Sequence, residues 1–191
     1  ISFASGAIAT IVLSLFASPL LSYMYGSDNA SKFLVLMAPF FLLLYVQFPL
    51  SATLQALDYA KAAMWNSIIS TGVKFVVLII LATNENFGIM GAALAIIVGV
   101  VLGTLLHLAT LVKVISFRIP IFDIVKMILL LISTWWVGTT LKELFPGYET
   151  SLPSFIMLLT CLTGIYIALL FLFRFITRDE IEQLPIFNRF T

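Results

Sequence analysis

The chain has 191 residues, of which 62% are hydrophobic and 10% charged, and its formal net charge is +1. Soluble domains carry about 25% charged residues, so this composition and a mean hydropathy of +1.15 exclude that class and indicate an integral membrane chain. The near-neutral charge gives no reason to expect a nucleic-acid partner. The lone Cys161 excludes an intrachain disulfide and cannot by itself form a thiolate metal site.

Six apolar runs are long enough to cross a bilayer core, which needs about 20 apolar residues per helix. They are predicted at residues 1–25, 32–57, 59–83, 87–115, 121–144 and 153–176. Polar or turn-forming residues separate them, as in GSDNAS after the first run and TNEN after the third. The pattern predicts an all-α, polytopic membrane helix bundle with six transmembrane helices.

The first run begins in mid-hydrophobic sequence, ISFASGAIATIVLSLF, without an initiating Met. This start predicts that the chain is the C-terminal part of a longer protein.

The distribution of Lys and Arg predicts the orientation, because cytoplasmic loops retain positive charge. One alternating set of loops and helix ends holds Lys61, Lys113, Arg118, Lys126, Arg174, Arg178 and Arg189. The other set holds only Lys32 and Lys142. The first set, and with it the C-terminus, is therefore predicted to be cytoplasmic.

Polar residues on the third predicted helix fall on one face, since each residue advances about 100° around a helix. They are Asn66, Ser67, Ser70, Thr71 and Lys74. A lysine is costly inside a bilayer, so this stripe indicates a hydrated cavity or pathway. In the alternative interpretation, Lys74 reaches the interface or caps carbonyls of a neighbouring helix, while the hydroxyls bond to their own backbone.

The second predicted helix carries Gln47, Ser51 and Gln55 at four-residue intervals, so they share a face toward its cytoplasmic end. A turn of only a few residues joins this helix to the third, and the two polar stripes can line one space. We expect that space to hold the polar part of a substrate, with Lys74 meeting an anionic group or an ion-pair partner. Amides between packed membrane helices can also serve only to join the helices.

The fourth predicted helix repeats small residues in a pattern that lets another backbone approach closely. The ridge consists of Gly91, Ala95, Gly99 and Gly103. His107 continues the row, and without a second His or a carboxylate at ligand spacing it favours a structural role over a proton relay.

Motifs of soluble and membrane enzymes are absent from the sequence: it has no GxSxG, HExxH or P-loop pattern. No cluster of metal-ligating residues is present either. We therefore expect neither an enzyme nor a bound metal or cofactor.

Four short features follow one another along the chain. They are Tyr25-Gly26 at a helix end, LQAL at a cytoplasmic turn, a lysine in the third predicted helix and GIMGAA at the start of the fourth. Together, within residues 1–115, they resemble the C-terminal lobe of the multidrug/oligosaccharidyl-lipid/polysaccharide exporter superfamily. Within that superfamily, the chain most resembles the polysaccharide biosynthesis proteins of the stage V sporulation protein B type and the related lipid II flippases. Many relatives have Gly after the LQxL turn, where this chain has Asp58.

The resemblance implies a protein of two pseudo-symmetric six-helix lobes followed by two further helices. Residues 1–115 would be the last four helices of the second lobe, 116–177 the two additional helices, and 178–191 a cytoplasmic tail. The chain would thus form the C-terminal part of a two-lobe transporter, whose N-terminal lobe is a partner outside this sequence.

The resemblance also implies a multi-pass protein of the bacterial cell membrane, in contact with membrane lipid. It would move an undecaprenyl-linked sugar or peptidoglycan precursor across the membrane by alternating access. Lys74 would line the central cavity near the pyrophosphate path. A multidrug or toxin cation antiporter of the same superfamily is an alternative, although it favours an intramembrane carboxylate. A non-transporting membrane scaffold is a second alternative, in which the polar stripe packs without water access.

Overall fold

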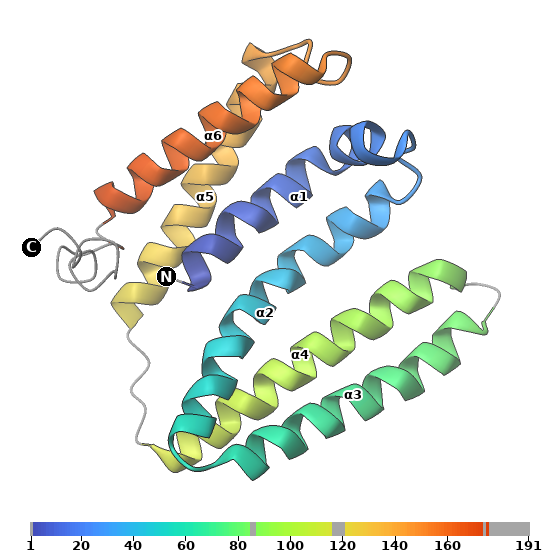
Figure 1. Cartoon of the computed structure of the whole chain (residues 1–191), viewed down its shortest axis with the longest axis vertical. Helices are drawn as coiled ribbons and strands as arrows, with labels where there is room; N and C mark the ends of the chain where they lie inside the picture. The colour runs from blue at the N-terminus through green and yellow to red at the C-terminus, as the bar shows by residue number, and fades with distance from the viewer. Residues whose placement is uncertain (1, 85–86, 116–120, 174, 176–191) are drawn as a thin grey trace, which may run out of the picture. The chain divides into compact units, whose positions relative to one another are not determined.

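The computed structural model describes residues 2–84, 87–115, 121–173 and 175, and its described elements are α-helices (Figure 1). They are α1 (Ser2–Tyr25), α2 (Ser31–Ala56), α3 (Ala60–Ala82), α4 (Gly88–Val114), α5 (Ile121–Leu144) and α6 (Leu152–Leu172). In the described chain, each of these six helices is long and apolar enough to cross a membrane. The predicted all-α fold with six spans is confirmed, and the chain is a multi-pass membrane protein segment.

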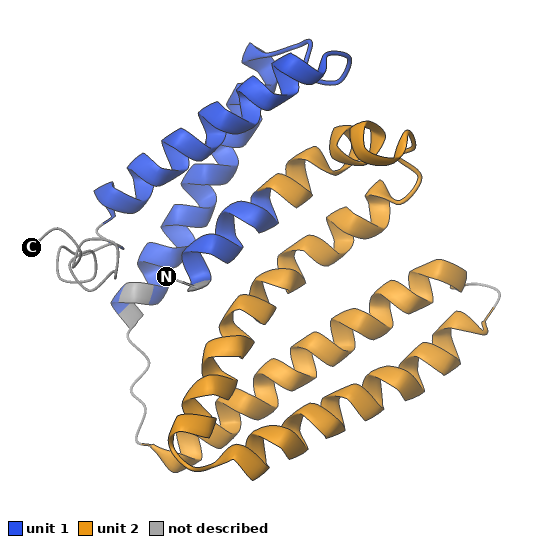
Figure 2. Ribbon diagram, viewed as in Figure 1, with its two compact units in different colours: residues 1, 3–11, 120–191 blue, residues 2, 12–119 orange. Residues whose placement is uncertain are grey.

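The chain divides into two compact units (Figure 2). The α2–α4 unit comprises residues 2 and 12–119, and the α5–α6 unit comprises residues 1, 3–11 and 120–191. The boundary near residue 120 lies close to the predicted one at 115/116, although the first residues of α1 belong to the α5–α6 unit. The three-part division and the cytoplasmic C-terminus remain predictions, and residues 178–191 lie outside the described residues.

A kink interrupts α1 at Phe16, whose backbone angles of φ −121° and ψ 21° are not helical. Pro19 follows three residues later and provides the cause. Its ring removes an N–H donor and clashes with the carbonyl of the residue four positions earlier, Leu15. The helix then ends at Gly26, where φ is +69°, a conformation that glycine adopts without a steric cost.

The turn between α2 and α3 is a Schellman motif with Asp58 in the left-handed conformation, at φ +65°. The Tyr59 N–H donates to the Leu54 carbonyl at 2.9 Å, and the Asp58 N–H donates to Gln55 at 3.2 Å. Asp adopts the left-handed backbone conformation more readily than most non-glycine residues. Position 58 therefore needs a residue that tolerates the left-handed conformation.

In the α2–α4 unit, α4 lies between α2 and α3 and packs against both (Figure 1). Its small residues allow this close approach. A Cβ added to Gly91 would lie 2.5 Å from the Leu81 carbonyl oxygen, so α3 and α4 meet backbone to backbone there. At the other end, Leu54, Ala63 and Leu111 form a buried cluster that joins all three helices.

In the α5–α6 unit, the two helices form a hairpin, and α6 buries one apolar row. The row consists of Phe155, Leu158, Leu162, Tyr166 and Leu170. The Tyr166 hydroxyl donates to the Ala4 carbonyl, which ties the first turns of α1 to this unit.

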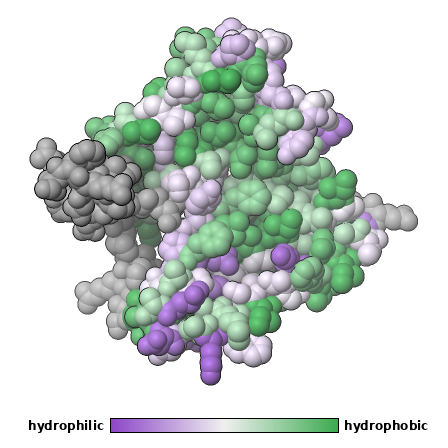
Figure 3. Space-filling view, in the orientation of Figure 1, coloured by the Kyte–Doolittle hydropathy of each residue, from purple (hydrophilic) through white to green (hydrophobic). Residues whose placement is uncertain are grey.

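Hydrophobic side chains cover much of the face seen in Figure 3. On α3 they form an outward row, with Ile79 and Ile80 exposed by 64% and 61%. Such a surface suits lipid and not water, because the hydrophobic effect opposes its exposure to an aqueous phase.

Candidate functional site

A cavity of 280 Å³ lies among α2, α3 and α4, within the α2–α4 unit. All three helices contribute to its wall: Leu44, Gln47, Ser70, Thr71, Lys74, Ile96, Gly99 and Val100. Its polar groups are one ammonium, one amide and two hydroxyls, set in an otherwise apolar wall. A few polar groups in a mostly apolar lining are a combination that ligand-binding sites share.

Lys74 is half-buried, and its aliphatic stem crosses the surface of α4 at Gly99. Its Nζ lies 5.4 Å from the centre of the Phe75 ring, within the range of a cation–π interaction. In the described part of the chain, this ammonium has no hydrogen-bond or ion-pair partner. It therefore caps no described carbonyl, and it can offer its three donors to a ligand.

Gln47 reaches the cavity from α2, and its amide meets α4 at two positions. The Thr104 hydroxyl donates to the Val100 carbonyl at 2.8 Å and lies 3.4 Å from Gln47 Oε1. The amide nitrogen lies over Gly103, where an added Cβ would come within 2.8 Å of it. Both ends of the amide are thus held against α4, which orients the group.

The two hydroxyls of the cavity come from consecutive residues of α3. Ser70 is 5% exposed, and its hydroxyl donates to the Ser67 carbonyl at 3.1 Å. Because that bond uses its only proton, Ser70 offers the cavity an acceptor. Thr71 is exposed and can both donate and accept.

The structure brings four of the seven predicted substrate-contacting residues together in the cavity: Gln47, Ser70, Thr71 and Lys74. Asn66 lies elsewhere, in the α3–α4 interface. Its amide donates to the Leu106 carbonyl at 3.2 Å and to the Thr110 hydroxyl at 2.9 Å. The side chain that the sequence placed on the same stripe thus joins two helices.

Ser51 and Gln55 also lie outside the cavity wall. The Gln55 amide donates to the Ser51 hydroxyl at 3.3 Å, one turn away on the same helix. Gln55 is exposed. The pair extends the polar face of α2 beyond the cavity without contributing to it.

His107 is fully buried, and its Nδ1 lies 2.7 Å from the Gly103 carbonyl oxygen. A carbonyl only accepts, so Nδ1 carries the proton. Nε2 is buried and has no hydrogen-bond partner among the residues that the structure describes. The His107 side chain therefore forms a hydrogen bond within α4 itself.

Metal-binding clusters are absent from the described residues. None of the residues that line the cavity is acidic. In the α5–α6 turn, the Tyr148 hydroxyl donates to Glu149 at 2.9 Å. Burial and that hydrogen bond raise the pKa of Tyr148 to about 12.

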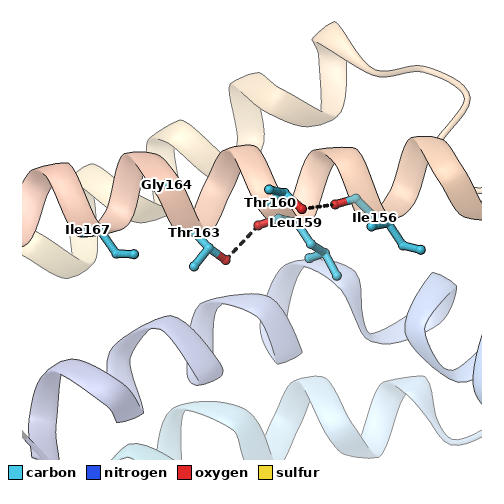
Figure 4. Close-up of a pocket in the computed structure, with 6 residues that line it drawn as sticks. All are labelled: Ile156, Leu159, Thr160, Thr163, Gly164 and Ile167. Atoms are coloured by element: carbon cyan, nitrogen blue, oxygen red, sulfur yellow. Dashed lines mark hydrogen bonds between the residues drawn. The ribbon is translucent and has the colours of Figure 1, made fainter. Parts of the chain in front are cut away.

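A second groove, of 450 Å³, runs along α6 beside Thr160, Thr163 and Gly164 (Figure 4). The two threonine hydroxyls donate to the Ile156 and Leu159 carbonyls of the same helix, at 2.8 Å each. The remaining wall is aliphatic. This groove is larger than the cavity between α2, α3 and α4, but it has no cationic or amide group.

Sequence reasoning missed four lining residues: Leu44, Ile96, Gly99 and Val100. Three are aliphatic and carry no distinguishing pattern. Gly99 was assigned to helix packing as part of a small-residue ridge. Its position opposite Lys74 depends on how α3 and α4 pair, which the ridge alone does not specify.

Comparison with known proteins finds a curated relative over nearly the whole chain. Stage V sporulation protein B of Bacillus subtilis (strain 168) is 41% identical over 185 residues, which is 97% of this chain. The chain is homologous to stage V sporulation protein B. The resemblance to that type of protein, predicted from the sequence, is confirmed. Sporulation protein YkvU of the same organism is 31% identical over 114 residues, or 60% of this chain.

The matched region spans 36% of the length of stage V sporulation protein B and 25% of that of YkvU. No family model matches the chain, and neither does any solved structure.

Proposed function

We propose that this chain is part of a flippase-type transporter that moves a lipid-linked oligosaccharide or peptidoglycan precursor across the cell membrane by alternating access. The observation that carries the proposal is the Lys74 ammonium beside the cavity among α2, α3 and α4, where no described residue forms an ion pair or hydrogen bond with it. Ionisable residues at such depth are costly and mark substrate paths. The homology to stage V sporulation protein B supports a role in sporulating cells.

The groups of the cavity suit an anionic headgroup that also carries hydroxyls. Lys74 supplies charge for a phosphate oxygen, because an ammonium binds phosphate as a point charge. The Gln47 amide and the Thr71 hydroxyl can bond to neighbouring sugar or phosphate oxygens. The apolar residues Leu44, Ile96 and Val100 lower the local dielectric constant beside these groups and so strengthen their interactions with a ligand.

A cation antiporter of the same superfamily is supported less well. A cationic substrate would have to enter a site whose only charged lining residue is a lysine. Like charges at close range in a medium of low dielectric repel strongly. The cavity therefore favours an anionic substrate.

The test is transport by full-length protein in proteoliposomes, with a fluorescent polyprenyl-diphosphate sugar as the probe. Lys74→Ala removes the charge that would bind the phosphate, so it should lower the rate per folded molecule by about tenfold or more. A tenfold loss corresponds to about 1.4 kcal/mol. Lys74→Arg keeps the charge and should lose less. Lys32→Ala is the matched control, because Lys32 is exposed at the start of α2.

Three outcomes would count against the proposal. A normal rate for Lys74→Ala would remove Lys74 from the transport path. Absence of any transport by the wild-type protein, together with normal sporulation of a Lys74→Ala strain, would favour the scaffold alternative. Export of a cationic dye by the wild type would favour the antiporter.

A further inference from the structure

We propose that Gly99 is a positioning residue of the cavity, which fixes the place of the Lys74 ammonium by leaving room for its stem. The sequence assigns Gly99 to helix packing, and the structure gives it this second role. The inference concerns the geometry of the site. It rests on the proposed function only where transport is the readout.

The stem of Lys74, from Cβ to Cδ, occupies the space that a side chain at position 99 would need. A Cβ added to Gly99 would lie 2.9 Å from Lys74 Cβ, 3.1 Å from Cγ and 3.0 Å from Cδ. Carbon atoms at optimal separation are about 3.5–4.0 Å apart. The lysine therefore lies flat across α4 in space that only a glycine leaves free.

Gly103, one turn further along α4, has the same relation to polar side chains. An added Cβ there would lie 2.8 Å from the Gln47 amide nitrogen and 3.2 Å from the Ser70 hydroxyl. The ridge thus has two uses. At Gly91 it admits the α3 backbone, whereas at Gly99 and Gly103 it admits the side chains that give the cavity its polarity.

A methyl group at position 99 has no inexpensive way to fit. Rotation about χ1 can move Lys74 Cγ and Cδ, but Cβ is fixed to the α3 backbone. Either the stem leaves the surface of α4, or α3 and α4 move apart. Both responses displace the ammonium from the cavity.

Other glycines of the chain show that this crowding is local. A Cβ at Gly72, on α3 two residues before Lys74, would meet nothing within 4 Å. Gly72→Ala is therefore a matched control, because it makes the same substitution on the neighbouring helix α3, where the added Cβ meets no other residue.

The first experiment measures how fast a water-soluble amine reagent modifies Lys74 in the full-length membrane protein, read by mass spectrometry. Gly99→Ala should slow the modification by about fivefold or more, which is within the usual range of coupling between touching residues. Gly72→Ala should leave the rate unchanged. Equal rates in the wild type, Gly99→Ala and Gly72→Ala would overturn the proposal.

The second experiment is a double-mutant cycle, with transport of the polyprenyl-diphosphate sugar as its readout. If Gly99 acts through Lys74, the double variant Gly99→Ala with Lys74→Ala should lose less transport than the sum of the two single losses, the remainder coming from the Cβ that alanine keeps. Fully additive losses per folded molecule would overturn the proposal. A normal transport rate for Lys74→Ala would contradict the proposed function. The amine modification of Lys74 would then still test the role of Gly99.

Folding provides a third readout if Gly99→Ala accumulates poorly. Lys74→Ala removes Cγ and Cδ, so it should restore part of the folded Gly99→Ala protein. A double variant that folds no better than Gly99→Ala would contradict the contact.

Discussion

Helices α4 and α6 look alike by hydropathy but use their small residues in opposite ways. Their most apolar stretches have hydropathies of 2.6 and 2.5. In α4, Gly91 and Gly103 are buried against α3 and α2, whereas Gly164 of α6 is exposed beside an open groove. Hydropathy identifies a span. Which face of it admits a neighbour depends on what stands opposite each glycine.

The polar side chains of α6 also differ from those of α2 and α3 in what they contact. The hydroxyls of Thr160 and Thr163 on α6 donate to their own backbone. On α3 and α2, Lys74 and Gln47 project across glycines of α4 and leave polar atoms at a cavity. A polar residue in a span therefore indicates a site only where a facing small residue makes room for it.

The largest expected effect is at Gly91. A methyl group there would lie 2.5 Å from the Leu81 carbonyl oxygen and 2.6 Å from its carbon, and these backbone atoms cannot rotate away. Gly91→Ala should lower the free energy of unfolding by about 1–3 kcal/mol, the usual cost of overpacking. Denaturant titration of the full-length protein in detergent micelles measures it.

Gly164→Ala is the control for that comparison. A Cβ at Gly164 meets nothing within 4 Å, so the variant should unfold within about 0.5 kcal/mol of the wild type. Equal destabilisation by the two substitutions would remove the distinction between α4 and α6.

A smaller effect is expected at Asn66, which joins α3 to α4 through Leu106 and Thr110. Asn66→Ala should cost about 0.6 kcal/mol of stability and at most about 1.7, the average and the maximum measured for hydrogen bonds between membrane helices. It should leave transport per folded molecule near the wild-type rate, because Asn66 does not line the cavity. A transport loss as large as that of Lys74→Ala would return Asn66 to the substrate path.

Much of the fold could be predicted from the sequence because membrane spans obey a local rule of length and apolarity. The kink of α1 and the α2–α3 turn likewise follow from single residues, Pro19 and Asp58. The four-residue spacing of the small residues predicted a close-packing face on α4. These features depend on a residue and its near neighbours along the chain.

The site could be predicted only in part. Periodicity placed Asn66 and Lys74 on one stripe, yet one faces Thr110 and the other Gly99. That difference arises from the pairing of α3 with α4, between residues far apart in sequence. The spacing on α2 likewise could not tell that Gln47 reaches α4 while Ser51 and Gln55 bond to each other.

The central claim is that water and substrate reach the cavity between α2, α3 and α4. Its most direct test is modification of a cysteine at Thr71 by a membrane-impermeant thiol reagent, in full-length protein with Cys161 replaced by Ser. Thr71 lines the cavity, and Ile79 on the same helix belongs to the apolar outer row. We expect rapid modification of Thr71→Cys and none of Ile79→Cys. Equal protection of both positions would contradict it.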